Sequence, residues 1–112
     1  MEALHEALAS HRAIIALNVP WSGYARKAKA TIETASPKLK LLQITFVAVD
    51  EESADVRGWL NEHAPKLLTG DFARGAGSIF WLEEGRVVDF EVNGGNLTEQ
   101  ELLNRTRVRS DN

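Results

Sequence analysis

The stretch that decides the fold is AIIALNVPWSGYARKAK, residues 13–29, where a near-continuous apolar run meets a helical pattern at a short turn. A run such as 13–19, with no polar side of its own, is typical of a strand covered by helices on both faces of a sheet. Ser22 has the chemistry of a helix N-cap, because its hydroxyl can accept a hydrogen bond from an amide of the first turn. The helix that follows has apolar residues three and four apart, and Ser36-Pro37 is predicted to end it. The turn at 21–24 is therefore the first candidate site.

The rest of the chain also alternates between helix-like and strand-like spacing of its apolar residues. These patterns predict a helix over about 2–11 and a strand over 43–49. A second helix is expected to begin at the acidic residues 50–52 and to turn four side chains inward: Val56, Trp59, Leu60 and His63. Strands over 79–82 and 86–92, around the turn 83–85, and a last helix complete the order. This order predicts an α/β fold with a mixed sheet and helices on both of its faces.

The start of the last helix has the clearest local signal. Thr98 and Glu101 have the spacing of a capping box, and Leu97 and Leu102 have that of its hydrophobic staple. We expect residues 105–112 to fray, with 108–112 as a tail, and the arginines there to act as solubilising side chains.

Composition limits the possible functions. The 112 residues fit one domain, 1–112, and a net charge of -3 gives no reason to expect nucleic acid as a partner. The sequence has no cysteine, which excludes disulfides, thiol catalysis and cysteine-bound metals. The N-terminus lacks the pattern of a signal peptide, and no stretch is long and apolar enough to span a membrane. We therefore expect a cytoplasmic protein without a membrane partner.

No metal site or cofactor is predicted. The densest acidic cluster, at 50–55, lacks the spacing of a calcium loop and lies at a predicted helix start, where acidic residues are common. His5 and His11 are six residues apart, which places them on different faces of a helix and argues against zinc.

Several segments together resemble the thioredoxin family. Trp21-Ser22-Gly23-Tyr24-Ala25 stands where the family has Trp-Cys-Gly-Pro-Cys, and the strand 43–50 ends at an aspartate as the family's next strand does. Residues 74–85 follow the family's Arg-Gly-Ile-Pro-Thr loop, apolar strand and glycine hairpin without a gap, and 94–95 match a later glycine bend. The resemblance covers about 13–107. It implies a three-layer α/β/α sandwich with about four strands and four helices.

The departures from the family concern its redox chemistry. Ser22 and Ala25 stand at the positions of the two cysteines, and Ala16 at that of the family's buried aspartate. Phe46 replaces the lysine near that aspartate, and Gly77 replaces the cis-proline. A buried carboxylate is costly without a partner or a task, so an apolar Ala16 and Phe46 fit a chain without thiols. The resemblance therefore implies a redox-inactive member.

Two further departures concern the outline of the fold. The family's extra edge strand has no counterpart, so the strand 43–49 is expected at an exposed edge of the sheet. The connection from 50 to 77 is longer than in the family. Long loops in compact domains are often functional, so Lys66 to Arg74 is a candidate contact surface or lid.

The function predicted first is binding of a protein or peptide at the former active-site face. There, Trp21 and Tyr24 are either partly buried packing residues or aromatic anchors. The candidate groove consists of Trp21, Ser22, Gly23, Tyr24, Ala76, Gly77, Ser78, Gly94 and Gly95.

Two alternatives stay open. Ser22 at the start of a helix could bind glutathione or a small anion, as some transferases of this fold do. The strand 43–49 could instead pair with a second copy, which would make a monomer or weak homodimer the expected state.

Overall fold

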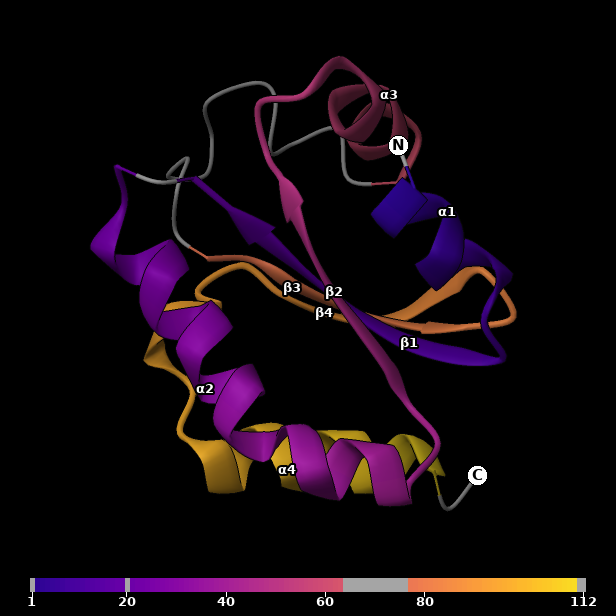
Figure 1. The fold of residues 1–112 in the computed structure, drawn as a ribbon, viewed down its shortest axis with the longest axis vertical. Helices are drawn as coiled ribbons and strands as arrows, with labels where there is room; N and C mark the ends of the chain where they lie inside the picture. The colour runs from indigo at the N-terminus through magenta and orange to yellow at the C-terminus, as the bar shows by residue number, and fades with distance from the viewer. Residues whose placement is uncertain (1, 20, 64–76, 111–112) are drawn as a thin grey trace.

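The computed structural model describes residues 2–19, 21–63 and 77–110 and has helices on both sides of a four-stranded sheet (Figure 1). The elements are α1 (Glu2–Ala9), β1 (Arg12–Asn18), α2 (Gly23–Leu41), β2 (Thr45–Asp50), α3 (Ala54–His63), β3 (Ile79–Glu83), β4 (Arg86–Glu91), the short 3-10 helix η2 (Gly94–Asn96) and α4 (Glu99–Ser110). The predicted α/β class and element order are confirmed.

The sheet is mixed, with the strand order β2-β1-β3-β4. β1 runs parallel to β2 and antiparallel to β3, while β3 and β4 form an antiparallel hairpin. Ala13 to Leu17 of β1 are buried, which is the burial expected for an apolar strand between two layers of helices. β2 lies at the edge of the sheet, as predicted.

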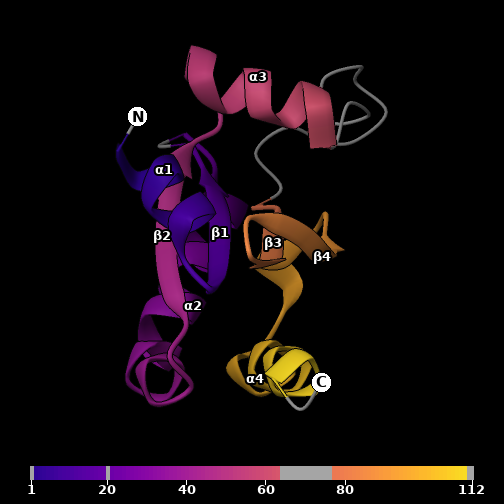
Figure 2. The same cartoon turned by 90° about the vertical axis from the view of Figure 1, so that its right-hand side faces the viewer.

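Each face of the sheet has its own apolar core. α1 and α3 cover one face, where Leu4, Trp59 and Phe80 are buried. α2 and α4 cover the other, where Ile32, Trp81 and Leu102 are buried. Figure 2 shows the two helix layers above and below the strands. Because side chains of a strand alternate between faces, β1 contributes Ile15 to the first core and Ile14 to the second.

The predicted end of the helix at Ser36-Pro37 is wrong. α2 continues through Pro37 to Leu41, and Figure 1 shows a bend along its length. Proline removes one amide from the helix and favours a kink. Ala35 and Leu39, on either side of it, are completely buried, with 0% and 1% exposure. This burial outweighs the lost hydrogen bond and keeps the segment helical.

Two other helix predictions need correction. The acidic residues 50–52 do not start α3: Asp50 ends β2, and Glu51 and Glu52 form a turn. Ser53 caps the helix by accepting a hydrogen bond from the Val56 amide at 3.3 Å. His63 is exposed instead of turned inward, although its ring lies 5.0 Å from that of Trp59. Residues 105–110 do not fray but form the last turns of α4.

The predicted capping box of α4 is confirmed. The Glu101 amide donates to Thr98 Oγ1 at 3.1 Å, and the Thr98 amide donates to Glu101 Oε1 at 3.0 Å. These bonds to the backbone and hydroxyl of Thr98 lower the pKa of the Glu101 carboxyl. Leu97 and Leu102 lie in the same apolar core, as the predicted staple requires.

Candidate functional site

The turn into α2 is organised by Ser22. This residue is extended, with φ -100° and ψ 123°, and its Oγ accepts a hydrogen bond from the Ala25 amide at 3.2 Å. Its side chain is only 6% exposed. Ser22 is therefore the predicted N-cap, and its hydroxyl is turned into the helix start rather than toward solvent.

The two aromatic residues beside Ser22 are the most distinctive feature of this end of the molecule. Trp21 is 62% exposed and Tyr24 is 65% exposed. The Trp21 ring nitrogen donates to Glu52 Oε1 at 3.1 Å, which ties the ring to the turn after β2. Both residues are therefore more exposed than the packing interpretation predicts. We call Trp21 and Tyr24 the aromatic surface.

Gly77 and Gly95 pack against the main chain of Tyr24, and Gly94 packs against Gly77. A Cβ on Gly77 would lie 2.8 Å from the Tyr24 carbonyl oxygen, and Gly77 has a φ of +76°. A Cβ on Gly95 would lie 2.6 Å from the same oxygen, and one on Gly94 would lie 2.1 Å from the Gly77 carbonyl oxygen. The close backbone approach predicted at Gly77 is thus observed, and the start of α2 itself fills that space.

The other predicted groove residues have different environments. Ser78 is 2% exposed, and its Oγ donates to the Val92 carbonyl at 2.8 Å, so it holds β3 to the end of β4. Gly23 is exposed beside Tyr24. Ala76 and the predicted lid at 66–74 lie outside the described residues, as does the peptide bond before Gly77. The structure thus brings Tyr24, Gly77 and Gly95 together.

Three of the positions that the sequence analysis matched to the family's redox residues are apolar and pack in or against the core. Ala16 and Ala25 are 0% and 1% exposed, and Phe46 packs against the core between the sheet and α2. This interior contains no ionisable group at these positions to support proton transfer. It agrees with the sequence argument that the support for a thiol pair is absent.

The acidic side chain at the end of β2 stabilises the turn that follows it. Asp50 Oδ1 accepts a hydrogen bond from the Glu52 amide at 2.8 Å. Within residues 2–19, 21–63 and 77–110, no group of three His, Asp or Glu side chains could hold a metal ion. None of the helices in these ranges is long and apolar enough to cross a membrane.

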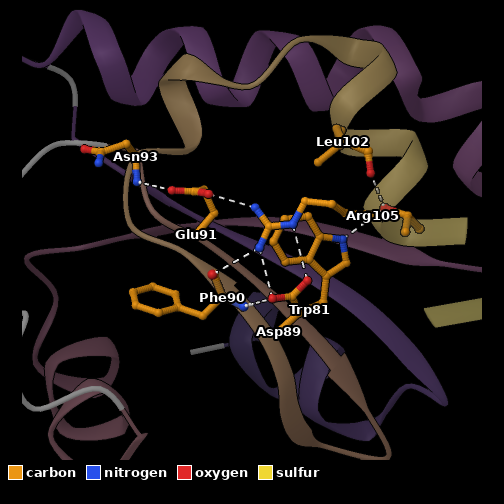
Figure 3. A network of polar contacts seen from close by, with 8 residues as sticks. Trp81, Asp89, Phe90, Glu91, Asn93, Leu102 and Arg105 are labelled. Atoms are coloured by element: carbon orange, nitrogen blue, oxygen red, sulfur yellow. Dashed lines mark hydrogen bonds and ion pairs between the residues drawn. The ribbon is translucent and has the colours of Figure 1, made fainter. Parts of the chain in front are cut away.

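A second polar cluster, which the sequence analysis missed, joins α4 to β4 (Figure 3). Arg105 donates to Asp89 Oδ1 at 2.9 Å and to Glu91 Oε1 at 2.7 Å, and its guanidinium lies 4.5 Å from the centroid of Trp81. The Trp81 ring nitrogen donates to Thr106 Oγ1 at 2.9 Å. We call these five residues the Arg105 network.

The electrostatics of this network fit a structural role. Partial burial acts to lower the pKa of Arg105, but the hydrogen bonds and charges of Asp89 and Glu91 outweigh it and raise that pKa. The guanidinium is therefore held in its charged form, which suits its bonds to two carboxylates. A sequence signal did exist, since Asp89 and Glu91 are two residues apart and so share one face of the strand.

Comparison with known proteins supports the fold. Neither protein-family models nor curated protein sequences match the chain. Among solved structures, thioredoxin O2 from Arabidopsis thaliana in the oxidised state matches with a TM-score of 0.64 and 16% identity, covering 96% of this chain and 83% of that chain. Reduced desulfothioredoxin from Desulfovibrio vulgaris Hildenborough matches with a TM-score of 0.67 and 11% identity, covering 94% of this chain and 88% of that chain.

A third match is the pair of first thioredoxin domains of Saccharomyces cerevisiae Eps1p. It has a TM-score of 0.67 and 21% identity, and covers 97% of this chain and 39% of that chain. The chain therefore has the thioredoxin fold, with the four-stranded mixed sheet described above. Since the sequence contains no cysteine, this fold fits a redox-inactive member of the thioredoxin-like proteins.

Proposed function

We propose that this chain binds a protein or peptide through the aromatic surface and has no thiol–disulfide exchange activity. The observation that carries the proposal is the exposure of Trp21, just before the N-cap of α2, and of Tyr24, on its first turn, at 62% and 65%. Tryptophan and tyrosine dominate the energetics of many interfaces. Burying the exposed part of each ring would contribute roughly 3 kcal/mol.

The surroundings of the aromatic surface suit an anchor. Trp21 is held by its hydrogen bond to Glu52, so less side-chain entropy is lost when a partner binds. The packed main chain of Gly77 and Gly95 beneath Tyr24 gives the surface a firm base. A partner would therefore meet two exposed rings, of which that of Trp21 is held by a hydrogen bond.

Nuclear magnetic resonance tests this proposal. We would select peptides from a random display library against the whole chain and map the amide shifts that the selected peptides cause. Shifts should cluster at residues 21–25, and Trp21→Ala should weaken binding by about tenfold or more. Leu41→Ala is the matched control, because Leu41 is 84% exposed at the other end of α2. Shifts clustered elsewhere would overturn the proposal.

A reduction assay tests the catalytic half of the proposal. Insulin reduction by dithiothreitol should proceed at the same rate with and without the protein, because the chain has no thiol to exchange. An acceleration above the reagent background would contradict the proposed redox inactivity.

The glutathione alternative has less support. Ser22 is 6% exposed, and its Oγ already accepts a hydrogen bond from the Ala25 amide, so a thiolate would have to displace that bond. Calorimetry with millimolar glutathione separates the two proposals, because the peptide-binding proposal predicts no heat. A cytoplasmic location also stays a proposal; fluorescence microscopy of the tagged chain in its native cell would test it.

A further inference from the structure

The outer edge of β2 is a second candidate interaction surface. In the part of the chain that the structure describes, β2 ends the strand order and pairs only with β1. Figure 2 shows β2 at one margin of the sheet, with α1 and α2 on opposite faces. A groove runs beside its first half, with Glu6 of α1 on one side, Ser36 and Lys40 of α2 on the other, and Ile44, Thr45 and Phe46 along it.

This edge has none of the usual protection against pairing. Edge strands commonly carry a lysine, a proline or a bulge that prevents a further strand from adding. β2 reads TFVAVD and keeps a regular register with β1 over six residue pairs. Five consecutive residues before Asp50 are β-branched, aromatic or small and carry no charge. The strand is therefore suited to pair on its outer side.

The direction of the main-chain groups follows from one hydrogen bond. The Glu51 amide donates to the Asn18 carbonyl at 3.0 Å, so it points toward β1. Successive residues of an extended strand direct their amide and carbonyl groups to alternate sides. The main-chain groups of Phe46 and Ala48 therefore point outward, and those of Val47 point toward β1.

Two copies of this strand are complementary when antiparallel. With Val47 opposite its own copy on a two-fold axis perpendicular to the sheet, Phe46 lies opposite the small Ala48 of the second copy. The Phe46 and Ala48 groups of both copies then form four main-chain hydrogen bonds. In this pairing each Phe46 lies opposite an Ala48, so a large side chain meets a small one at both positions. The corresponding helix layers of the two copies lie on the same face of the combined sheet.

The charges at the two ends of β2 favour the same pairing. In this register Asp50 of the second copy lies opposite Ile44, which lines the groove together with Lys40. Asp50 has the strand parity of Phe46 and so faces the α2 side, where Lys40 lies. Glu6 belongs to α1, which covers the opposite face. Each copy thus offers a lysine to the other copy's aspartate.

We infer that the outer edge of β2 binds a second copy of this chain through an antiparallel β2–β2 pair centred on Val47, making one continuous eight-stranded sheet. The contact is small and lies in the range of weak, transient interfaces. It uses residues other than Trp21 and Tyr24, and its Asp50 end adjoins Glu52, the hydrogen-bond partner of Trp21.

Cysteine cross-linking tests the register directly, since the natural chain has no cysteine of its own. Val47→Cys should form a covalent dimer under mild oxidation, because a non-hydrogen-bonded pair has Cα atoms about 4.5 Å apart, within disulfide range. Ala48→Cys is the matched control and should stay monomeric, since its two copies would lie about 8 Å apart on a diagonal. Cross-linking at Ala48 but not at Val47 would overturn the proposed register.

Sedimentation of the unmodified chain tests the association itself. At hundreds of micromolar the mass should approach twice 12.4 kDa. Lys40→Glu, on the surface of α2, should weaken association several-fold at low salt, whereas Lys27→Glu should not. Circular dichroism would verify that each variant is folded. A monomer at every concentration, together with no cross-linking at Val47, would overturn the inference.

Discussion

Two tryptophans mark the contrast between the aromatic surface and the Arg105 network. Trp21 is 62% exposed and donates to Glu52, while Trp81 is 2% exposed and donates to Thr106. A hydrogen bond to the ring nitrogen therefore does not distinguish them. The difference lies in burial and in the guanidinium of Arg105 over the Trp81 ring. We expect Trp81 to act on stability and Trp21 to act on binding.

The largest effect is expected from Trp81→Ala. Removing a buried aromatic side chain costs about 3–5 kcal/mol of unfolding free energy, and here it also leaves Thr106 without the ring donor. Urea unfolding followed by circular dichroism measures the loss. Trp81→Phe, which keeps much of the volume, should cost less. A loss below about 1 kcal/mol for Trp81→Ala would contradict the structural assignment.

The next largest loss of stability is expected at Gly94, which packs against Gly77. Gly94→Ala would place a Cβ 2.1 Å from the Gly77 carbonyl oxygen, and such overpacking should cost about 2–3 kcal/mol. Gly58→Ala is the matched control, because a Cβ there meets nothing within 4 Å and alanine favours the helix. Thermal unfolding should rank Gly94→Ala below the natural chain and Gly58→Ala at or above it. The reverse order would contradict the close packing of Gly94 against Gly77.

Arg105→Ala should have an intermediate effect. It breaks charge-assisted bonds to Asp89 and Glu91 in a partly exposed site, for an expected loss of about 2 kcal/mol. Arg105→Lys should recover part of this loss, because it keeps the charge but not the planar fork. Denaturant unfolding of both variants provides the measurement. An equal loss of unfolding free energy in Arg105→Lys and Arg105→Ala would mean that the stabilisation depends on the planar guanidinium and not on its charge.

Trp21→Ala should have the smallest effect on stability. Because its side chain is mostly exposed, the unfolding free energy should change by no more than about 0.5 kcal/mol. The same variant should lose peptide binding, which isothermal calorimetry with a selected peptide would detect. A destabilisation comparable to that of Trp81→Ala would remove the distinction between the two tryptophans.

Much of the fold follows from local patterns in the sequence. The apolar run of β1, the Ser22 cap and the Thr98–Glu101 box each depend on neighbouring residues, and all three are observed. The continuation of α2 through Pro37 could not be predicted in this way. It depends on the burial of Ala35 and Leu39 against elements far away in the sequence.

The candidate site also has features that follow from local sequence and features that depend on tertiary packing. The positions matched to the family's redox residues are a prediction from their register along the chain, whereas the exposure of Trp21 and Tyr24 is a tertiary property. The Arg105 network was missed because local composition made 105–112 look like a charged, fraying end. Only the packing of α4 beside β4 brings Arg105 to the acidic pair Asp89 and Glu91.

This small chain presents two proposed binding surfaces, the aromatic surface and the outer edge of β2. The 19 residues of α2 span roughly 28 Å, with Tyr24 on the first turn and Lys40 on the last. Tyr24 and Lys40 therefore lie near opposite ends of one helix, whereas Asp50 at the end of β2 lies beside Glu52, the hydrogen-bond partner of Trp21. In the paired form, two aromatic surfaces would be displayed at once, and a ligand with two matching segments would gain avidity without any new contact.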